Sequence, residues 1–169
     1  MNDTASGPTR AGVGVIGIGN LLLRDEGFGV HALRALAGEL EADGVRLIDG
    51  GTDPWSALSA AEGCRVLVVL DAVVGGKAPG ECHALSLDEV EMQNAAMSLH
   101  GLTLFHLLRY EKLLGDGPER VRVLGMEPDV VEAGMGLSDC CRQSMPAFIR
   151  MAKDEIRAAQ GCAAHCAPA

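Results

Sequence analysis

Aromatic residues and basic clusters are both scarce in this sequence. Phe, Trp and Tyr make up only 3% of the 169 residues, and 14 Lys and Arg stand against 23 Asp and Glu, for a net charge of −9. Proteins that bind nucleic acid need basic surface to neutralise phosphate charge, usually gathered on one face or along one helix. The composition therefore argues against a nucleic-acid partner.

Long apolar runs are missing as well. No stretch approaches the roughly 20 apolar residues of a membrane span. Residues 1–10 are polar and the apolar run after them is broken by glycines, unlike a cleavable signal. We expect a cytoplasmic protein with no membrane contact and with its six cysteines reduced. The spacing in Cys162-Ala-Ala-His165-Cys166 matches no common zinc pattern, and we expect a frayed chain end there.

Apolar residues and glycine are plentiful, at 48% of the chain and 22 positions respectively. Short apolar runs predict buried strands, and apolar residues that recur every three or four positions predict helices. The expected strands are 12–18, 44–49, 65–70, 120–125 and an edge strand at 81–87; the expected helices are 26–41, 54–61, 99–114 and 138–158, the last kinked or restarted at Pro146.

Alternating strands and helices predict an α/β fold: a single domain with a twisted, mainly parallel sheet and helices on both faces. We assign this domain to residues 11–159, with a flexible N-terminus at 1–10 and a flexible tail at 160–169. The run 65–70 is apolar throughout, as expected of a parallel strand that is covered on both faces.

A glycine turn joins the first predicted strand to the first predicted helix. Gly17 and Gly19 fit the first two glycines of a dinucleotide-binding fingerprint, but Leu22 stands where the third should be. The helix then opens with Asp25 and Glu26, so a phosphate at this positive helix end would meet two negative charges. A carboxylate held here is better suited to gripping a cation than a nucleotide.

Ligands of such sheets bind outside the carboxyl ends of the strands, where several polar residues should converge. Glu26 follows the first strand, Asp49 ends the second, Asp71 ends the central one, and His100 opens a helix. A helix N-terminus disfavours a protonated imidazole, so we expect His100 to be neutral and able to ligate. Two carboxylates and an imidazole suit nickel, zinc, iron or manganese, and leave positions open for a substrate or water.

Each of these residues also has a structural explanation. Glu26 fits the first turn of any helix, and an acid that follows a strand often only caps a turn. The stretch Glu127-Pro128-Asp129 is either a second acid pair or a turn. No Ser-His-Asp order with a nucleophile elbow is present, and Cys64 reads as a small buried hydrophobe.

Five ordered motifs resemble one known family. The segment Gly17-Ile-Gly-Asn-Leu-Leu-Leu-Arg-Asp-Glu-Gly-Phe-Gly-Val30 resembles the opening signature of the hydrogenase maturation endopeptidases, which remove a C-terminal extension from the large subunit of nickel–iron hydrogenases. Four further stretches agree in order and spacing, and the match covers about residues 13–157: Asp49-Gly-Gly-Thr52, Leu70-Asp71-Ala-Val73, Ser98-Leu-His100-Gly-Leu102, and Gly125-Met-Glu-Pro128 with Gly136-Leu-Ser138.

The resemblance implies an aspartyl-type, nickel-dependent processing endopeptidase whose partner is a hydrogenase large-subunit precursor. Carried over by position, the metal-contacting residues are Glu26, Asp71 and His100, and the nickel belongs to the substrate. Asp49 lies in the family's Asp-Gly-Gly-Thr turn and would help to position the substrate. Either nickel activates the carbonyl or a water, or a carboxylate such as Asp49 or Asp71 is the general base.

Two other functions compete with this one. A non-proteolytic, metal-binding maturation factor would use the same three residues and needs no nucleophile. A nucleotide-binding domain is suggested by Gly17 and Gly19 but is opposed by the acidic helix start. We expect no nucleotide cofactor, and a monomer, because the domain must embrace a large partner.

Overall fold

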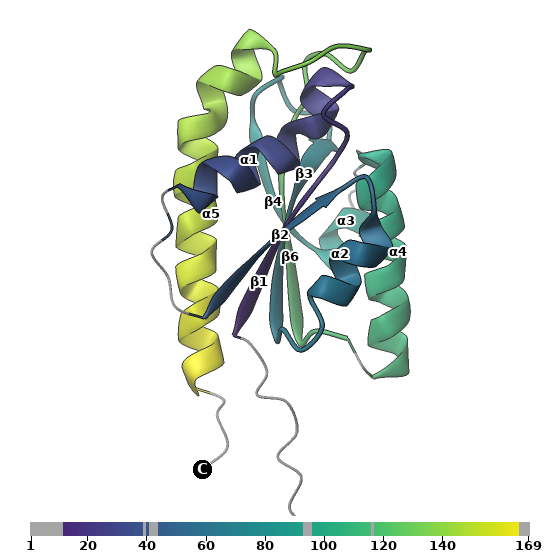
Figure 1. Cartoon of the computed structure of the whole chain (residues 1–169), viewed down its shortest axis with the longest axis vertical. Helices are drawn as coiled ribbons and strands as arrows, with labels where there is room; N and C mark the ends of the chain where they lie inside the picture. The colour runs from purple at the N-terminus through teal and green to yellow at the C-terminus, as the bar shows by residue number, and fades with distance from the viewer. Residues whose placement is uncertain (1–11, 39, 41–43, 93–95, 116, 166–169) are drawn as a thin grey trace, which may run out of the picture.

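A central sheet covered by helices on both faces forms the body of the protein (Figure 1). The computed structural model describes residues 12–38, 40, 44–92, 96–115 and 117–165. One face of the sheet carries α1 (Phe28–Ala37) and α5 (Asp139–His165). The other face carries α2 (Pro54–Ala60), α3 (Leu87–Met92) and α4 (Leu99–Leu114).

The strand order is β2-β1-β3-β6-β4, with β5 paired to the end of β3. Strands β1, β2, β3 and β6 run parallel, whereas β4 is antiparallel to β6 and forms an edge. The predicted α/β domain with a mainly parallel sheet is thus confirmed. The strands are β1 (Val13–Ile18), β2 (Val45–Gly51), β3 (Val66–Val74), β4 (Cys82–Ser86), β5 (Ala96–Met97) and β6 (Arg120–Met126).

Successive side chains of the central strand β3 point to opposite faces of the sheet. Leu70 and Ala72 join the core beneath α1 and α5, while Val69 and Val73 join the core beneath α2 and α4. The eight residues from Val66 to Val73 are all buried, as expected of a strand covered on both faces. By this alternation Asp71 faces the side of the sheet that carries α4.

The first predicted helix starts later than the sequence suggests. A short 3-10 helix, η1 (Arg24–Gly27), comes between the glycine turn and α1, so the prediction that Asp25 and Glu26 open an α-helix was wrong. The backbone N–H of Asp25 donates to the carbonyl of Val130, far along the chain. A tertiary hydrogen bond therefore shapes this turn.

Two other boundaries also moved. β3 continues past Asp71 to Val74, because Asp71 still pairs with Gly125 on β6 and Val73 pairs with Met97 on β5. Helix α5 is continuous to His165, so it does not restart at Pro146, and residues 160–165 of the predicted tail are helical. The apolar stripe Phe148, Ile149 and Ala152, packed on the sheet just past the proline, explains this continuity.

The first helix also ends earlier than predicted, at Ala37 and not at residue 41, and α3 and β5 were not predicted. The other predicted segments agree with the structure to within two residues at each end, and residues 1–11 and 166–169 lie outside the described part of the chain. Among the described residues, no helix combines the length and the apolar character that a membrane crossing requires.

Candidate functional site

The candidate site lies at the carboxyl ends of the parallel strands, where three elements meet. Glu26 belongs to η1, which follows β1; Asp71 lies near the end of β3; and His100 lies in the first turn of α4. Parallel strands bring their carboxyl ends to one edge of a sheet, so residues that are distant in sequence gather there.

The glycine turn after β1 serves to hold Glu26. Gly19 has a φ of +132°, and a Cβ at this position would lie 2.0 Å from the carbonyl oxygen of Glu26, so only glycine fits. The backbone N–H of Asn20 then donates to Glu26 Oε2 over 2.6 Å. The amide that a phosphate would use is therefore occupied by the chain's own carboxylate, as the acidic sequence suggested.

Asp71 is fully buried and only partly satisfied. Its Oδ2 accepts a hydrogen bond from the backbone N–H of Ser98 over 3.1 Å, while Oδ1 has no partner among the described residues. Burial raises the pKa of Asp71 to about 8, and the nearby charge of Glu26 adds to this effect. The side chain therefore holds a proton at neutral pH, and a cation that binds there must displace that proton.

Ser98 joins Asp71 to the helix that carries His100. Its backbone donates to Asp71, and its Oγ caps α4 by accepting from the N–H of Gly101 over 3.0 Å. His100 is partly exposed two residues further on. Ser98 was not among the predicted site residues, although its place before a helical stretch is a sequence signal for a helix cap.

Asp49 lies apart from this group, because its side chain points to the other face of the sheet. It stands in register with Gly17 on β1, and a Cβ at Gly17 would contact Leu33 of α1. Asp49 is 48% exposed and pairs with Arg34 of α1 over 3.3 Å. The structure thus brings Glu26 close to Asp71 but leaves Asp49 across the sheet.

There is no preformed metal site made of Glu26, Asp71 and His100. Within the described residues, no three His, Cys, Asp or Glu side chains lie close enough together to hold a metal ion. Two features nevertheless fit a cation brought by another molecule: the unpartnered Oδ1 of Asp71 and the neighbouring negative charge of Glu26. A substrate that carries its own metal ligands would need only a few contacts from this chain.

Two further buried carboxylates serve the backbone around the site. Asp25 accepts from three backbone N–H groups of residues 129–138. Burial alone would raise the pKa of Asp25, but the hydrogen bonds from Ser138, Val130 and Asp129 outweigh it and lower that pKa. Glu127 contacts His83 over 2.7 Å and holds the loop after β3, whereas Asp129 is exposed, so these two acids do not act as a pair.

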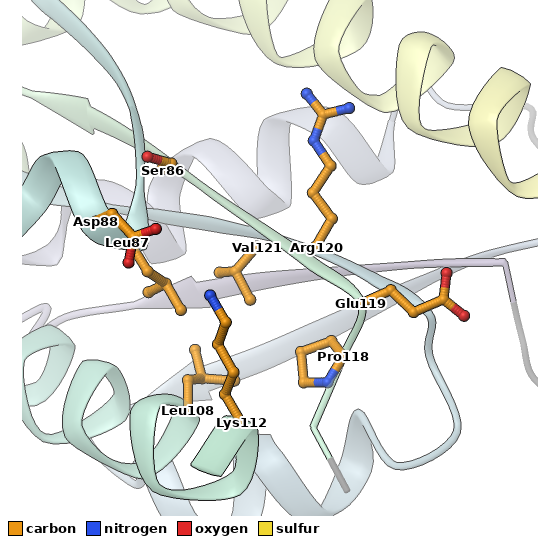
Figure 2. Close-up of a pocket in the computed structure, with 9 residues that line it drawn as sticks. All are labelled: Ser86, Leu87, Asp88, Leu108, Lys112, Pro118, Glu119, Arg120 and Val121. Atoms are coloured by element: carbon orange, nitrogen blue, oxygen red, sulfur yellow. The ribbon is translucent and has the colours of Figure 1, made fainter. Parts of the chain in front are cut away.

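A separate cavity of about 140 Å³ lies at the opposite end of the strands from the candidate site, beside the start of β6 and the last turns of α4 (Figure 2). Both apolar and charged side chains line it. Its distance from the carboxyl ends of the strands excludes it from the candidate site. Its lining residues are Ser86, Leu87, Asp88, Leu108, Lys112, Pro118, Glu119, Arg120 and Val121.

Comparisons with known proteins agree with the motifs. The family model for hydrogenase maturation proteases matches residues 30–155. The hydrogenase expression/formation protein HupD of Thiocapsa roseopersicina is 37% identical over 146 residues, which are 84% of this chain and 66% of that protein. The hydrogenase 2 maturation protease of Escherichia coli is 32% identical over 148 residues, 86% of this chain and 88% of that protein.

The fold agrees as well. The hydrogenase maturating endopeptidase HybD from Escherichia coli superimposes with a TM-score of 0.77 at 28% identity, covering 86% of this chain and 91% of that chain. The maturation protease HybD from Thermococcus kodakarensis shares the fold at 23% identity, with a TM-score of 0.69 over 84% of this chain and 97% of that one. The chain therefore belongs to the hydrogenase maturation protease family.

Proposed function

We propose that this protein is an endopeptidase that removes the C-terminal extension of a nickel–iron hydrogenase large-subunit precursor once nickel has been inserted. Family membership supports the reaction class. The observation that carries the nickel checkpoint is the fully buried Asp71, whose Oδ1 has no partner among the described residues and whose pKa is raised further by the charge of Glu26. Such a site can bind a cation that arrives with the substrate.

In this proposal the nickel is part of the substrate, and Glu26, Asp71 and His100 contact it. The two carboxylates supply negative charge and the imidazole supplies a nitrogen ligand, a donor set that suits nickel. Asp71 gives up its proton when the cation arrives, because the positive charge removes the cost of burying a carboxylate. The precursor is cleaved only when its nickel completes these contacts.

The general base of this proposal is Asp71 and not Asp49. Asp71 faces the same side of the sheet as α4 and interacts with Glu26. Asp49 points toward α1, where it pairs with Arg34, so its role would be to position the substrate protein from the other side of the sheet edge.

Mass spectrometry of a large-subunit precursor, incubated with this protein with and without nickel loading, tests the proposal. We expect loss of a short C-terminal peptide from the loaded precursor only. Cleavage of both samples would retain the protease and discard the checkpoint. No cleavage of a cognate loaded precursor would favour a non-proteolytic maturation factor.

The role of His100 is tested by H100A, with H106A as the matched control on the same helix. His106 is exposed two turns further along α4, so its loss should leave cleavage unchanged. We expect H100A to retain the wild-type melting temperature and to lose cleavage by a factor on the order of 100 or more. Wild-type cleavage by H100A would remove His100 from the site.

A further inference from the structure

Asp25, the neighbour of Glu26, is a fully buried carboxylate that holds a distant segment of the chain. Its Oδ2 accepts from the backbone N–H groups of Asp129 over 3.0 Å and of Val130 over 2.9 Å. Its Oδ1 accepts from the N–H of Ser138 over 2.7 Å. The 129–138 segment, which links β6 to α5, thus wraps around this single side chain from more than 100 positions away.

Backbone hydrogen bonds tie the same two parts of the chain together. The N–H of Arg24 donates to the carbonyl of Gly134, and the N–H of Gly134 donates to the carbonyl of Leu22. Arg24 also reaches Glu132 through an ion pair of 3.1 Å. The turn that carries Glu26 is therefore held to the 129–138 segment through Leu22, Arg24 and Asp25.

The turn needs these hydrogen bonds to the 129–138 segment because its own backbone is strained. Arg24 has a φ of +52°, and among the described residues it is the only one other than glycine with a positive φ. This conformation costs on the order of 1 kcal/mol for an L-residue and persists only where the surroundings impose it. Two residues later, Glu26 depends on this turn to keep its carboxylate beside Asn20 and near Asp71.

We propose that Asp25 is a positioning residue that sets the placement of Glu26 by anchoring the 129–138 segment to the strained turn. The inference rests on the proposed function, because Glu26 acts there as a contact to the substrate's nickel. Asp25 itself is fully buried, and its carboxylate accepts from backbone amides of the 129–138 segment. Its effect on the reaction passes through the backbone to the next residue.

The test compares D25N with V66A. Asparagine keeps the size of Asp25, but its amide nitrogen cannot accept the N–H bonds that the second carboxylate oxygen takes. Val66 is a buried residue at the amino end of β3, so V66A lowers stability without touching the site. Both variants are assayed for KM and kcat on nickel-loaded precursor and for hydrogen exchange, and the folded fraction of each is measured by circular dichroism under the assay conditions.

We expect D25N to raise KM at least tenfold and to speed exchange at Asp129, Val130 and Ser138 selectively. A merely structural role would lower the folded fraction, and so the apparent kcat, with KM unchanged, as we expect for V66A. Wild-type KM in D25N, or a pattern like that of V66A, overturns the proposal. If D25N does not fold, E132A breaks the exposed Arg24–Glu132 pair instead: a two- to threefold rise in KM supports the proposal, and an unchanged KM overturns it.

The exchange measurement separates this inference from the proposed function. If the wild-type protein cleaves no precursor, the proposed function fails. Asp25 then still counts as the anchor of the 129–138 segment if D25N loses protection there, and not otherwise. If the wild-type protein cleaves and D25N cleaves equally well, only the positioning role fails.

Discussion

Two buried aspartates near the site differ in charge because they differ in hydrogen bonding. Burial raises the pKa of both, since it disfavours the charged form. Asp25 more than recovers this cost through the backbone N–H groups of residues 129–138. Asp71 accepts too few hydrogen bonds to do so and leaves Oδ1 unpartnered within the described part of the chain. The carboxylate of Asp25 therefore holds the backbone together, whereas the carboxyl group of Asp71 keeps one oxygen available for a ligand.

This difference gives Asp71 a defined effect on stability. Its pKa is about 8 in the folded state, against an ordinary value of 3.8 for aspartate, so the folded protein holds a proton between these values that the unfolded chain releases. The contribution of Asp71 to the free energy of unfolding therefore falls with rising pH across this range, by about 1.4 kcal/mol per pH unit at most, and levels off above pH 8.

We expect D71N to remove this fall, because asparagine is neutral at every pH. The free energy of unfolding of D71N minus that of the wild type should grow from about pH 4 to about pH 8 and stay constant above. Urea unfolding at intervals of one pH unit measures it. Parallel curves for the two proteins would show that the buried Asp71 carries its charge throughout.

At the level of helices and strands, the close packing of α1 against the sheet determines the position of η1 and of Glu26. A Cβ on Gly29 would stand 2.0 Å from the carbonyl oxygen of Leu70, and one on Gly17 would stand 2.5 Å from the carbonyl oxygen of Gly29. The first turn of α1 therefore packs directly on the backbone of β1 and β3. This contact brings the preceding turn to the carboxyl end of the sheet.

We expect G29A to lower the free energy of unfolding by about 3 kcal/mol or more, because backbone atoms cannot move aside as a side chain can. G38A is the matched control. Gly38 ends the same helix with a φ of −78°, and its Cβ would meet only the carbonyl oxygen of Ala35, at 3.7 Å. G38A should change stability by less than about 1 kcal/mol. Equal effects of the two substitutions in urea unfolding would contradict this account of the packing.

At the scale of the whole molecule, Glu127 connects segments that are far apart in sequence. Its carboxylate contacts His83 on β4 and accepts from the backbone N–H groups of Gly75 and Lys77, so it joins the end of β6 to the edge strand and to the loop after β3. Burial alone would raise the pKa of Glu127, but the hydrogen bonds from Gly75, His83 and Lys77 lower it. Its stabilising effect is present above the ordinary glutamate pKa and is lost as the pH falls through the lowered one.

We expect E127Q to lower the free energy of unfolding at pH 7 by about 1–3 kcal/mol, because the buried amides lose a charged acceptor. The deficit should shrink as the pH falls below the ordinary glutamate pKa, because the unfolded chain then takes up a proton that the folded protein binds only at lower pH. Thermal unfolding at pH 7 and at pH 3.5 checks both statements. The control is E155Q, which weakens a partly exposed ion pair with Arg122 and should cost less than about 1 kcal/mol. A deficit that does not depend on pH would contradict the role of the Glu127 charge.

Much of the fold could be predicted because its signals are local. The apolar run 65–70 and the stripe of residues 99–114 each specify an element through neighbouring residues, and Gly115 ends α4 in the left-handed conformation that favours glycine. The errors fall where distant contacts decide. Pairing with β5 and β6 carries β3 past Asp71, and a hydrogen bond to Val130 shapes the turn before α1.

The order of strands and helices, the family of the chain, and the acids and histidine expected at the carboxyl ends of the strands can all be read from the amino-acid sequence. The opposite orientations of Asp49 and Asp71, and the anchoring of a segment more than 100 residues away by Asp25, become visible only in the folded chain. The two sets of features differ in the range over which they are specified. Periodicity and capping act over a few residues, whereas burial, register and hydrogen bonds to distant amides exist only once the chain has folded.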